Sequence, residues 1–177
     1  MQVAREQDRI RLKLNPLEAQ IFEQILRLII KHYKLGPAEL DPKSASAWYS
    51  KRGCKTAGMS EEETSDWIET LHDLRTGRLG RLEEWVARLT TRKAPAIDLE
   101  FTFGEASTLL TVLNDHRLFV AARHDIGQHE MDLHSVRALK ELTSAQQNAV
   151  CEIHFLAIVM EELLRFVAPE ASGWMAP

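Results

Sequence analysis

The hydrophobic pattern changes its period within the stretch Arg9-Ile10-Arg11-Leu12-Lys13-Leu14-Asn15-Pro16-Leu17-Glu18. The first six residues alternate between polar and apolar side chains, which is typical of a half-buried strand. Asn15, Pro16 and Glu18 then supply an N-cap, a first helical residue with fixed φ and a capping-box partner. The stretch therefore predicts a strand that leads directly into a helix, which continues to about Lys34.

A second strand-to-helix stretch is Ile97-Asp98-Leu99-Glu100-Phe101-Thr102-Phe103-Gly104-Glu105. Its outward residues are acidic, whereas those of the first strand are Arg9, Arg11 and Lys13. Opposite charges on neighbouring strands contribute roughly 0.2–1 kcal/mol per pair, so we expect the two strands to pair. Thr102 and Glu105 form a second capping box, which predicts a helix over about residues 104–123.

Two more capping signals mark further helices. Ser60 and Glu63 begin a helix that is interrupted at Gly77-Arg78-Leu79-Gly80 and resumes up to Leu89, so we expect a helical hairpin or a kink there. Thr143-Ser144-Ala145-Gln146 caps a final helix that reaches Val167. Residues 36–59 contain many helix breakers, and we expect one short helix around Trp48.

These elements predict an α+β fold that is mainly α. We expect a helical core of about five helices and a small two- or three-stranded sheet from the N-terminal segment and residues 97–103. A chain of 177 residues with 45% hydrophobic and 27% charged residues is typical of one folded domain. We assign residues 1–170 to that domain and residues 171–177 to a flexible tail.

Charge and cysteine content exclude several classes of protein. A net charge of −4 gives no overall attraction to nucleic acid or to an anionic membrane. Cys54 and Cys151 lie far apart and form no disulfide framework. The N-terminus is charged, and the longest apolar run, Phe155–Met160, is far shorter than the ~20 residues that span a bilayer. We therefore expect a cytoplasmic protein with no membrane partner.

A polar cluster interrupts the helix predicted near residues 104–123, in Leu113-Asn114-Asp115-His116-Arg117-Leu118. Arg117 shares one helical side with three apolar residues, where burial without a partner costs several kcal/mol. Glu161 and Glu162 of the last helix are candidate partners for it. Asn114, Asp115 and Arg117 therefore form either a structural network that locks helix packing or a pocket for a ligand or partner.

The same cluster, followed by Arg123-His124-Asp125-Ile126, resembles the signature "LNDLRL … R-L-x-I" of a bacterial family, domain of unknown function 2017. The charged N-terminal strand, the Leu/Glu-rich first helix and the Leu/Glu-rich closing helix are also similar to that family. Its genes often neighbour the gene for the ClpS protease adaptor, so the resemblance implies a link to regulated proteolysis or stress responses. The family has no established catalytic residues, and the resemblance therefore implies none here.

Gly77-Arg78-Leu79-Gly80 offers an alternative function in nucleic-acid binding. It lies between two helices and ahead of a strand, in the order found around the GxxG loop of KH domains. Nearby positive charge comes from Arg75, Arg78, Arg81, Arg88 and Arg92. The preceding strand of that module is missing and the total charge is negative, so nucleic acid is disfavoured as a partner.

A metal- or thiol-dependent sensor is a second alternative. His116, His124, His129 and His134 lie near several carboxylates, but at intervals that place the imidazoles on different sides of a helix. Cys54 lies beside Arg52 and Lys55, which favour the thiolate. Cys151 and His154 are three residues apart in the most apolar helix, where we expect an unactivated buried thiol. We therefore assign no metal ligand, cofactor or catalytic residue.

The sequence contains no phosphate-binding loop and no nucleophile elbow. It favours a non-enzymatic protein-interaction or regulatory module. The partner is either another protein or a second copy of the chain, and we expect a homo-oligomer.

Overall fold

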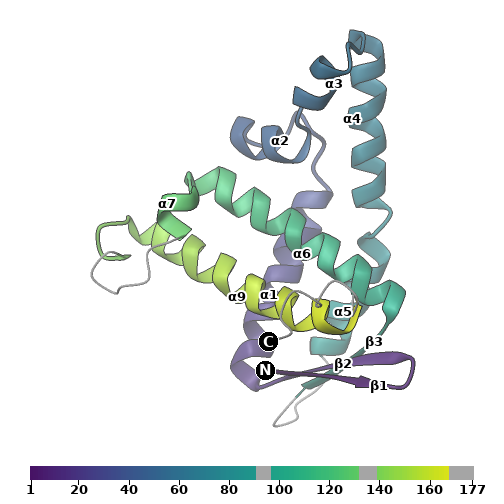
Figure 1. The fold of residues 1–177 in the computed structure, drawn as a ribbon, viewed down its shortest axis with the longest axis vertical. Coiled ribbons are helices and arrows are strands. Elements are labelled where there is room, and N and C mark those ends of the chain that lie inside the picture. The colour runs from purple at the N-terminus through teal and green to yellow at the C-terminus, as the bar shows by residue number, and fades with distance from the viewer. Residues whose placement is uncertain (91–96, 132–138, 168–177) are drawn as a thin grey trace, which may run out of the picture.

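The computed structural model describes residues 1–90, 97–131 and 139–167. Three antiparallel strands form one sheet in the order β1-β2-β3, with the bounds β1 (Gln2–Glu6), β2 (Arg9–Leu14) and β3 (Ile97–Thr102). The sheet lies at one end of the molecule, close to the N-terminus (Figure 1). The prediction of a small sheet built from the N-terminal segment and residues 97–103 is confirmed.

The predicted pairing of the two charged strands is also confirmed. In the register of β2 against β3, Arg11 lies opposite Glu100 and Lys13 opposite Asp98. Arg11 Nη2 is 3.3 Å from Glu100 Oε1. The alternate residues of both strands are buried and form the inner face of the sheet, as the period of two predicts: Ile10, Leu12, Leu14, Ile97, Leu99 and Phe101.

Helices make up most of the fold. Five have 12 residues or more: α1 (Pro16–Tyr33), α4 (Glu61–Thr76), α5 (Leu79–Thr90), α6 (Phe103–His124) and α9 (Ser144–Val167). Three are shorter: α2 (Pro42–Trp48), α3 (Arg52–Thr56) and α7 (Gln128–Met131). The part of the chain described here therefore has the mainly α, α+β architecture predicted from the sequence.

The predicted capping boxes form at the starts of three long helices. Both reciprocal hydrogen bonds are present at Asn15 with Glu18, at Ser60 with Glu63 and at Thr102 with Glu105. At the start of α9, the Gln146 backbone N–H donates to Thr143 Oγ1 at 3.3 Å. These caps satisfy backbone N–H groups that have no partner within the helix, so local sequence indicates where these four helices begin.

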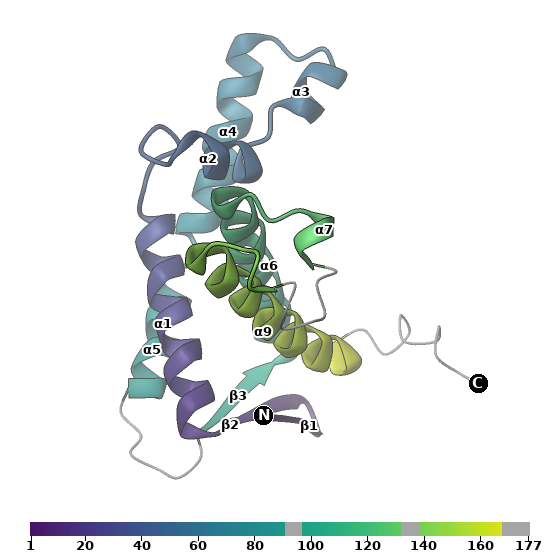
Figure 2. The ribbon, with the colours of Figure 1, turned by 90° about the vertical axis from the view of Figure 1, so that its left-hand side faces the viewer.

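The hydrophobic core lies between the sheet and the long helices. In Figure 2, α1 and α5 run side by side on one side of the body, and α6 crosses α9 on the other. Trp85 of α5 and Phe101 of β3 are fully buried and meet edge to face at 5.4 Å between ring centroids. This contact joins the helical layer to the sheet.

Helices α3 and α4 project from the body at the end opposite the sheet (Figure 1), and we call this part, residues 52–76, the arm. Arg75, near the base of the arm, is the one buried residue of α4. The chain changes direction at Gly77 and continues toward the sheet as α5, so the predicted interruption is a kink. A Cβ atom at Gly77 would lie 3.1 Å from the carbonyl oxygen of Asp73, so a side chain there would require that oxygen to move by a few tenths of an ångström.

No helix among residues 1–90, 97–131 and 139–167 is both long enough and apolar enough to cross a membrane.

Candidate functional site

Asp115 of α6 is the centre of a polar network that joins several helices. Tyr33 of α1 donates its hydroxyl to Asp115 Oδ2 at 2.8 Å, and Trp48 Nε1 of α2 donates to the Asp115 carbonyl oxygen at 2.7 Å. Arg75 Nη2 of α4 donates to Asp115 Oδ1 at 3.4 Å. Arg78 Nη1, at the kink between α4 and α5, lies 3.6 Å from Asp115 Oδ2. One carboxylate therefore ties α1, α4 and the kink to α6.

Arg75 is buried, and its guanidinium contacts a carboxylate, a backbone carbonyl and two aromatic rings. Its Nε lies 3.3 Å from Asp115 Oδ2 as an ion pair without hydrogen-bond alignment. Its Nη1 donates to the Leu71 carbonyl oxygen at 3.1 Å. The guanidinium carbon lies 5.2 Å from the ring centroid of Trp48 and 5.0 Å from that of Tyr49. The residue is only 8% exposed, and groups of the protein itself surround its charge.

Two tyrosines in and beside the network, Tyr33 and Tyr49, have raised pKa values. Burial raises the pKa of the Tyr33 hydroxyl well above its usual range, and the neighbouring Asp115 carboxylate raises it further. Burial likewise raises the pKa of Tyr49. Both phenols therefore stay protonated near neutral pH, and Tyr33 remains a hydrogen-bond donor to Asp115. A hydrogen bond of this kind suits the positioning of α1 against α6.

The structure separates the three site residues predicted from the sequence. Asp115 is partly buried in the network, whereas Asn114 is exposed and its side chain forms no hydrogen bond with the described residues. Arg117 lies on another side of α6, and its Nη1 contacts Met160 Sδ of α9 at 3.8 Å. The proposed partners Glu161 and Glu162 both pair with Arg165 instead, so that assignment was wrong.

We expect Arg117→Met to leave the free energy of unfolding unchanged within about 1 kcal/mol. The Nε atom of Arg117 is buried without a hydrogen-bond partner among the described residues. Methionine keeps the length and the apolar contacts of the arginine stem while removing that polar atom. Urea denaturation measures the difference, and a loss of about 3 kcal/mol or more would reveal a buried charge pair at Arg117.

A second buried polar cluster lies on α6 beside the network. His116 is 1% exposed, and its Nε2 is 2.6 Å from Glu152 Oε1 of α9. His32 of α1 stacks on Phe119 at 4.2 Å between ring centroids. Burial is the main cause that lowers the pKa of His32 to about 4, and the electrostatic influence of His116 and Arg123 lowers it further. His32 is therefore neutral at physiological pH.

The described histidines considered as metal ligands, His116, His124 and His129, form no metal-binding group. Within residues 1–90, 97–131 and 139–167, no three His, Cys, Asp or Glu side chains are placed to hold a metal ion. His116 lies in the core, and His129 lies on α7 beyond the end of α6. His134 falls outside the described residues.

The arginines around Gly77 and Gly80 are engaged within the chain. The stretch forms the kink and the first turn of α5 rather than an open loop. Arg75 and Arg78 pair with Asp115, and Arg81 Nη1 pairs with Glu105 at 2.8 Å. Arg88 Nη1 donates to the Glu100 carbonyl oxygen at 3.4 Å. Arg92, the fifth arginine considered for nucleic-acid binding, lies outside the described residues.

The two cysteine side chains differ in exposure. Cys54 of α3 is buried at 4% exposure, although it lies among basic residues. Cys151 of α9 is exposed, because it lies on the side of the helix that faces away from the core. The expectation of a buried thiol at Cys151 was wrong.

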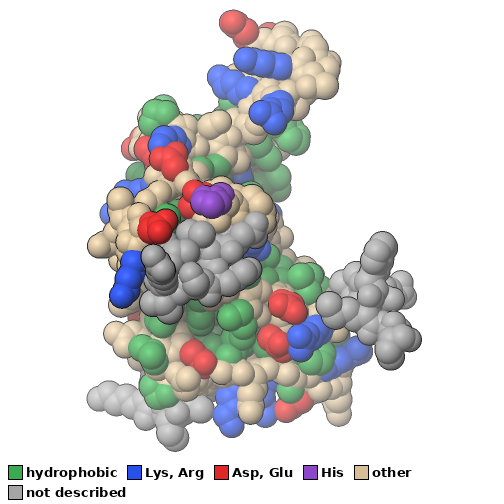
Figure 3. Space-filling view, turned by 60° about the vertical axis from the view of Figure 1, so that its left-hand side comes forward, with side chains coloured by type: hydrophobic (Ala, Val, Ile, Leu, Met, Phe, Trp, Pro, Cys, Tyr) green, Lys and Arg blue, Asp and Glu red, His purple; other side chains and the backbone are tan. Residues whose placement is uncertain are grey.

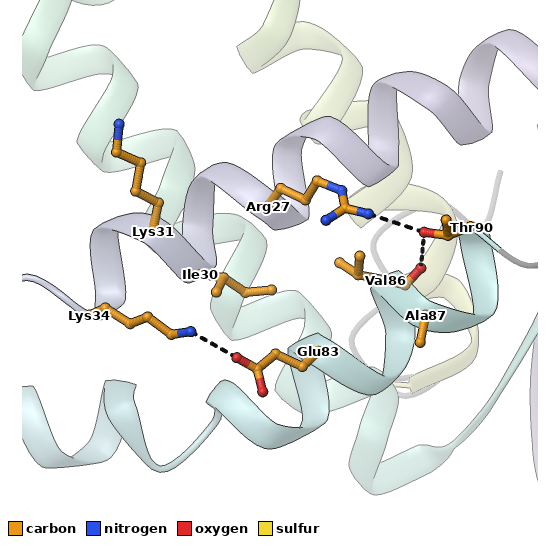
Figure 4. A pocket seen from close by; sticks show the side chains of 8 residues that line it. All are labelled: Arg27, Ile30, Lys31, Lys34, Glu83, Val86, Ala87 and Thr90. Carbon is orange, nitrogen blue, oxygen red and sulfur yellow. Dashed lines mark hydrogen bonds and ion pairs between the residues drawn. The ribbon is translucent and has the colours of Figure 1, made fainter.

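A groove of about 770 Å³ runs between α1 and α5 (Figure 4). Ile30 and Val86 form part of its floor. Lys34 Nζ pairs with Glu83 Oε1 across it at 2.9 Å, and Arg27 Nη2 donates to Thr90 Oγ1 at 3.2 Å. These two cross-links join α1 to α5 across the groove, so its walls are already held together.

One comparison with known proteins identifies the family. The model of the family described as domain of unknown function (DUF2017) matches residues 1–167. The chain belongs to the DUF2017 family. The family suggested by the sequence is thereby confirmed. No curated protein and no solved structure matches the chain.

In this DUF2017 member, sequence reasoning missed most partners of Asp115. The sequence could have indicated the position of Arg75, because it follows Ile68 and Leu71 on one side of α4. That side is directed toward the body of the protein. Tyr33 closes the apolar pattern of α1 in the same way. Trp48 lies among helix breakers, and nothing in the local pattern predicts that its indole N–H reaches Asp115.

Proposed function

We propose that the protein is a non-enzymatic protein-interaction module with a regulatory role, and that the arm binds the partner. The observation that carries this proposal is the exposure of two large apolar side chains on a projecting helix. Trp67 is 46% exposed and Leu74 is 55% exposed, both on α4. Exposed aromatic and aliphatic side chains grouped on one element are typical of interaction sites.

The two side chains lie seven residues apart, so they share one side of α4. Exposed carboxylates accompany them at Glu63, Asp66 and Asp73. Figure 3 shows hydrophobic side chains near the base of the arm and Lys or Arg side chains nearer its tip. A helix with this combination suits a partner that offers an apolar groove with a basic rim.

The Asp115 network supports this role by holding the base of the arm. Arg75 and Arg78 join α4 and the kink to α6 before any partner is bound. A surface that is already ordered loses less conformational entropy on binding, so more of the contact energy appears as affinity.

We place this module in the cytoplasm, as a homo-oligomer, with a link to regulated proteolysis or stress responses. Two cysteines without a disulfide support a reducing compartment. The proteolytic setting follows from the gene neighbourhood of the family.

The double variant Trp67→Ala, Leu74→Ala tests the proposal. Tagged protein isolated from its own host cells should lose bound partners by about tenfold or more, because both apolar contacts are gone. The free energy of unfolding should change by less than about 1 kcal/mol, since neither side chain is buried.

A matched control is the double variant Leu118→Ala, Leu164→Ala, whose side chains are 48% and 46% exposed on the body. The control should retain the partners of the unmodified protein. Equal retention by the arm variant would contradict the proposal.

A further inference from the structure

We infer that a second copy of this chain binds to the arm, with the basic α3 of each copy against the acidic side of α4 in the other. This inference rests on the proposed function and names one of its partners. The arm carries two charge clusters of opposite sign. From residue 44 to residue 60 the sequence has three cations and no acid, whereas from 61 to 74 it has six acids and no lysine or arginine. Each arm therefore offers both halves of a complementary contact.

The acidic half is a stripe along α4, which we call the acidic stripe. Its four members are exposed and are spaced four, three and four residues apart, which places them on one side of the helix: Glu62, Asp66, Glu69 and Asp73. None of them forms an ion pair with a described residue. Trp67 and Leu74 border the stripe, since each follows one of its aspartates. Like charges at this spacing repel one another, so the stripe is stabilised when cations lie against it.

The basic half lies on α3 and its N-cap, Lys51. Lys51, Arg52 and Lys55 are exposed, and no ion pair within residues 1–90, 97–131 and 139–167 involves them. Figure 3 shows Lys or Arg side chains near the tip of the arm. Lys51 and Lys55 line a groove of about 620 Å³ together with the apolar side chains of Met59 and Ile68. An exposed tryptophan bordered by carboxylates fits such a groove, because lysines attract both the ring face and the acids.

The two halves do not meet within one arm, because they lie on different sides of α4. The groove beside α3 is lined by a second row of α4 residues: Glu61, Thr64, Ser65 and Ile68. At the rotation per residue of an α-helix, the centre of this row lies roughly 120° around the axis from the centre of the acidic stripe. The cations of α3 therefore lie beside one side of α4 while the stripe is directed away from them.

A two-fold axis between two arms satisfies both halves at once. The α3 of the first copy then lies against the acidic stripe of the second, and the α3 of the second lies against the stripe of the first. Clusters of the same sign are kept apart. Figure 1 shows that the arm projects beyond the body, so its charged sides are open to a second arm.

Sedimentation equilibrium of the full chain at two salt concentrations is the first test. Each copy carries a net charge of −4, so a contact that ignored the charge clusters would strengthen as salt screens this repulsion. A contact between opposite clusters weakens instead. We expect a dimer at about 50 mM NaCl whose dissociation constant rises by about tenfold or more at about 500 mM NaCl. A protein that stays monomeric at both concentrations, or a dimer that strengthens with salt, would overturn the inference.

Charge reversal in each half gives the second test. One variant, Lys51→Glu, Arg52→Glu, Lys55→Glu, makes α3 acidic, and the other, Asp66→Lys, Glu69→Lys, Asp73→Lys, makes the stripe basic. Each variant alone should dimerise about tenfold or more weakly than the unmodified protein, because like charges then meet at both contacts. An equimolar mixture should restore a dimer that contains one copy of each, since every α3 again meets a stripe of opposite sign. Restoration also shows that both variants are folded.

A control variant reverses charges on the body. Lys31→Glu, Lys140→Glu alters two exposed side chains outside the arm and should leave the dissociation constant unchanged within about twofold. If the mixture of the two arm variants fails to dimerise, the inference is wrong. The proposed function is judged separately: loss of other host proteins from the Trp67→Ala, Leu74→Ala variant would support it even if the chain proved monomeric.

Discussion

Asp115→Ala is expected to lower the free energy of unfolding by about 3–5 kcal/mol. The substitution removes the carboxylate that pairs with Arg75 and accepts the Tyr33 hydrogen bond, and it leaves a guanidinium buried at 8% exposure. A buried charge without its partner is one of the few single changes with so large an effect. Urea denaturation followed by circular dichroism measures the loss.

The neighbouring residue provides the control. Asn114→Ala alters an exposed side chain on the same helix and should change the free energy of unfolding by no more than about 0.5 kcal/mol. Hydrogen exchange should localise the effect of Asp115→Ala to α4 and the kink, since these are attached through Arg75 and Arg78. If the two variants are equally stable, the Asp115 network does not hold the arm to the body.

Stability should also fall by about 3 kcal/mol when the pH is lowered through the range set by His32. An unfolded histidine has a pKa of 6.5, whereas burial lowers the pKa of folded His32 to about 4. Between these values the unfolded chain binds a proton that the folded chain excludes. The contribution is therefore complete above pH 6.5 and is lost progressively as the pH falls toward 4.

His32→Phe isolates this contribution from those of carboxylates. Glu18 and Asp41 have lowered pKa values, and the stability they contribute is lost only at more acidic pH. Phenylalanine keeps an aromatic ring against Phe119 and cannot be protonated. Denaturation midpoints of the variant should therefore vary less than those of the parent between pH 6.5 and 4.5. If the midpoints of the two proteins change equally with pH, the pKa of His32 is not lowered by folding.

Much of the fold was predictable because its signals are local. The alternation in Arg9–Leu14 and Ile97–Thr102, together with the capping residues, places both strands and the starts of the long helices. The opposite charges at Arg11 and Glu100 also predict the pairing of β2 with β3, although those residues are far apart in the chain. Helix α3 was missed because its N-cap, Lys51, makes no side-chain hydrogen bond and Gly53 lies within it.

The site was less predictable because its contacts are tertiary. A helical wheel for α6 correctly marks Asp115 and Arg117 as unusual, but it does not identify which element lies beside each of them. The direction of α4 places Arg75 beside Asp115, and the position of α9 places Met160 beside Arg117. The projection of the arm has the same origin, since the pattern of Trp67, Leu71 and Leu74 by itself resembles that of an ordinary buried helix.

Photo-crosslinking from the arm in living host cells tests most directly whether the arm binds a partner. A photoreactive phenylalanine analogue replaces Trp67 in one strain and Leu118, which is nearly equally exposed on the body, in another. We expect discrete crosslinked proteins from position 67 and none, or far weaker ones, from position 118. Equal crosslinking at the two positions, or none at position 67, would contradict the assignment of partner binding to the arm.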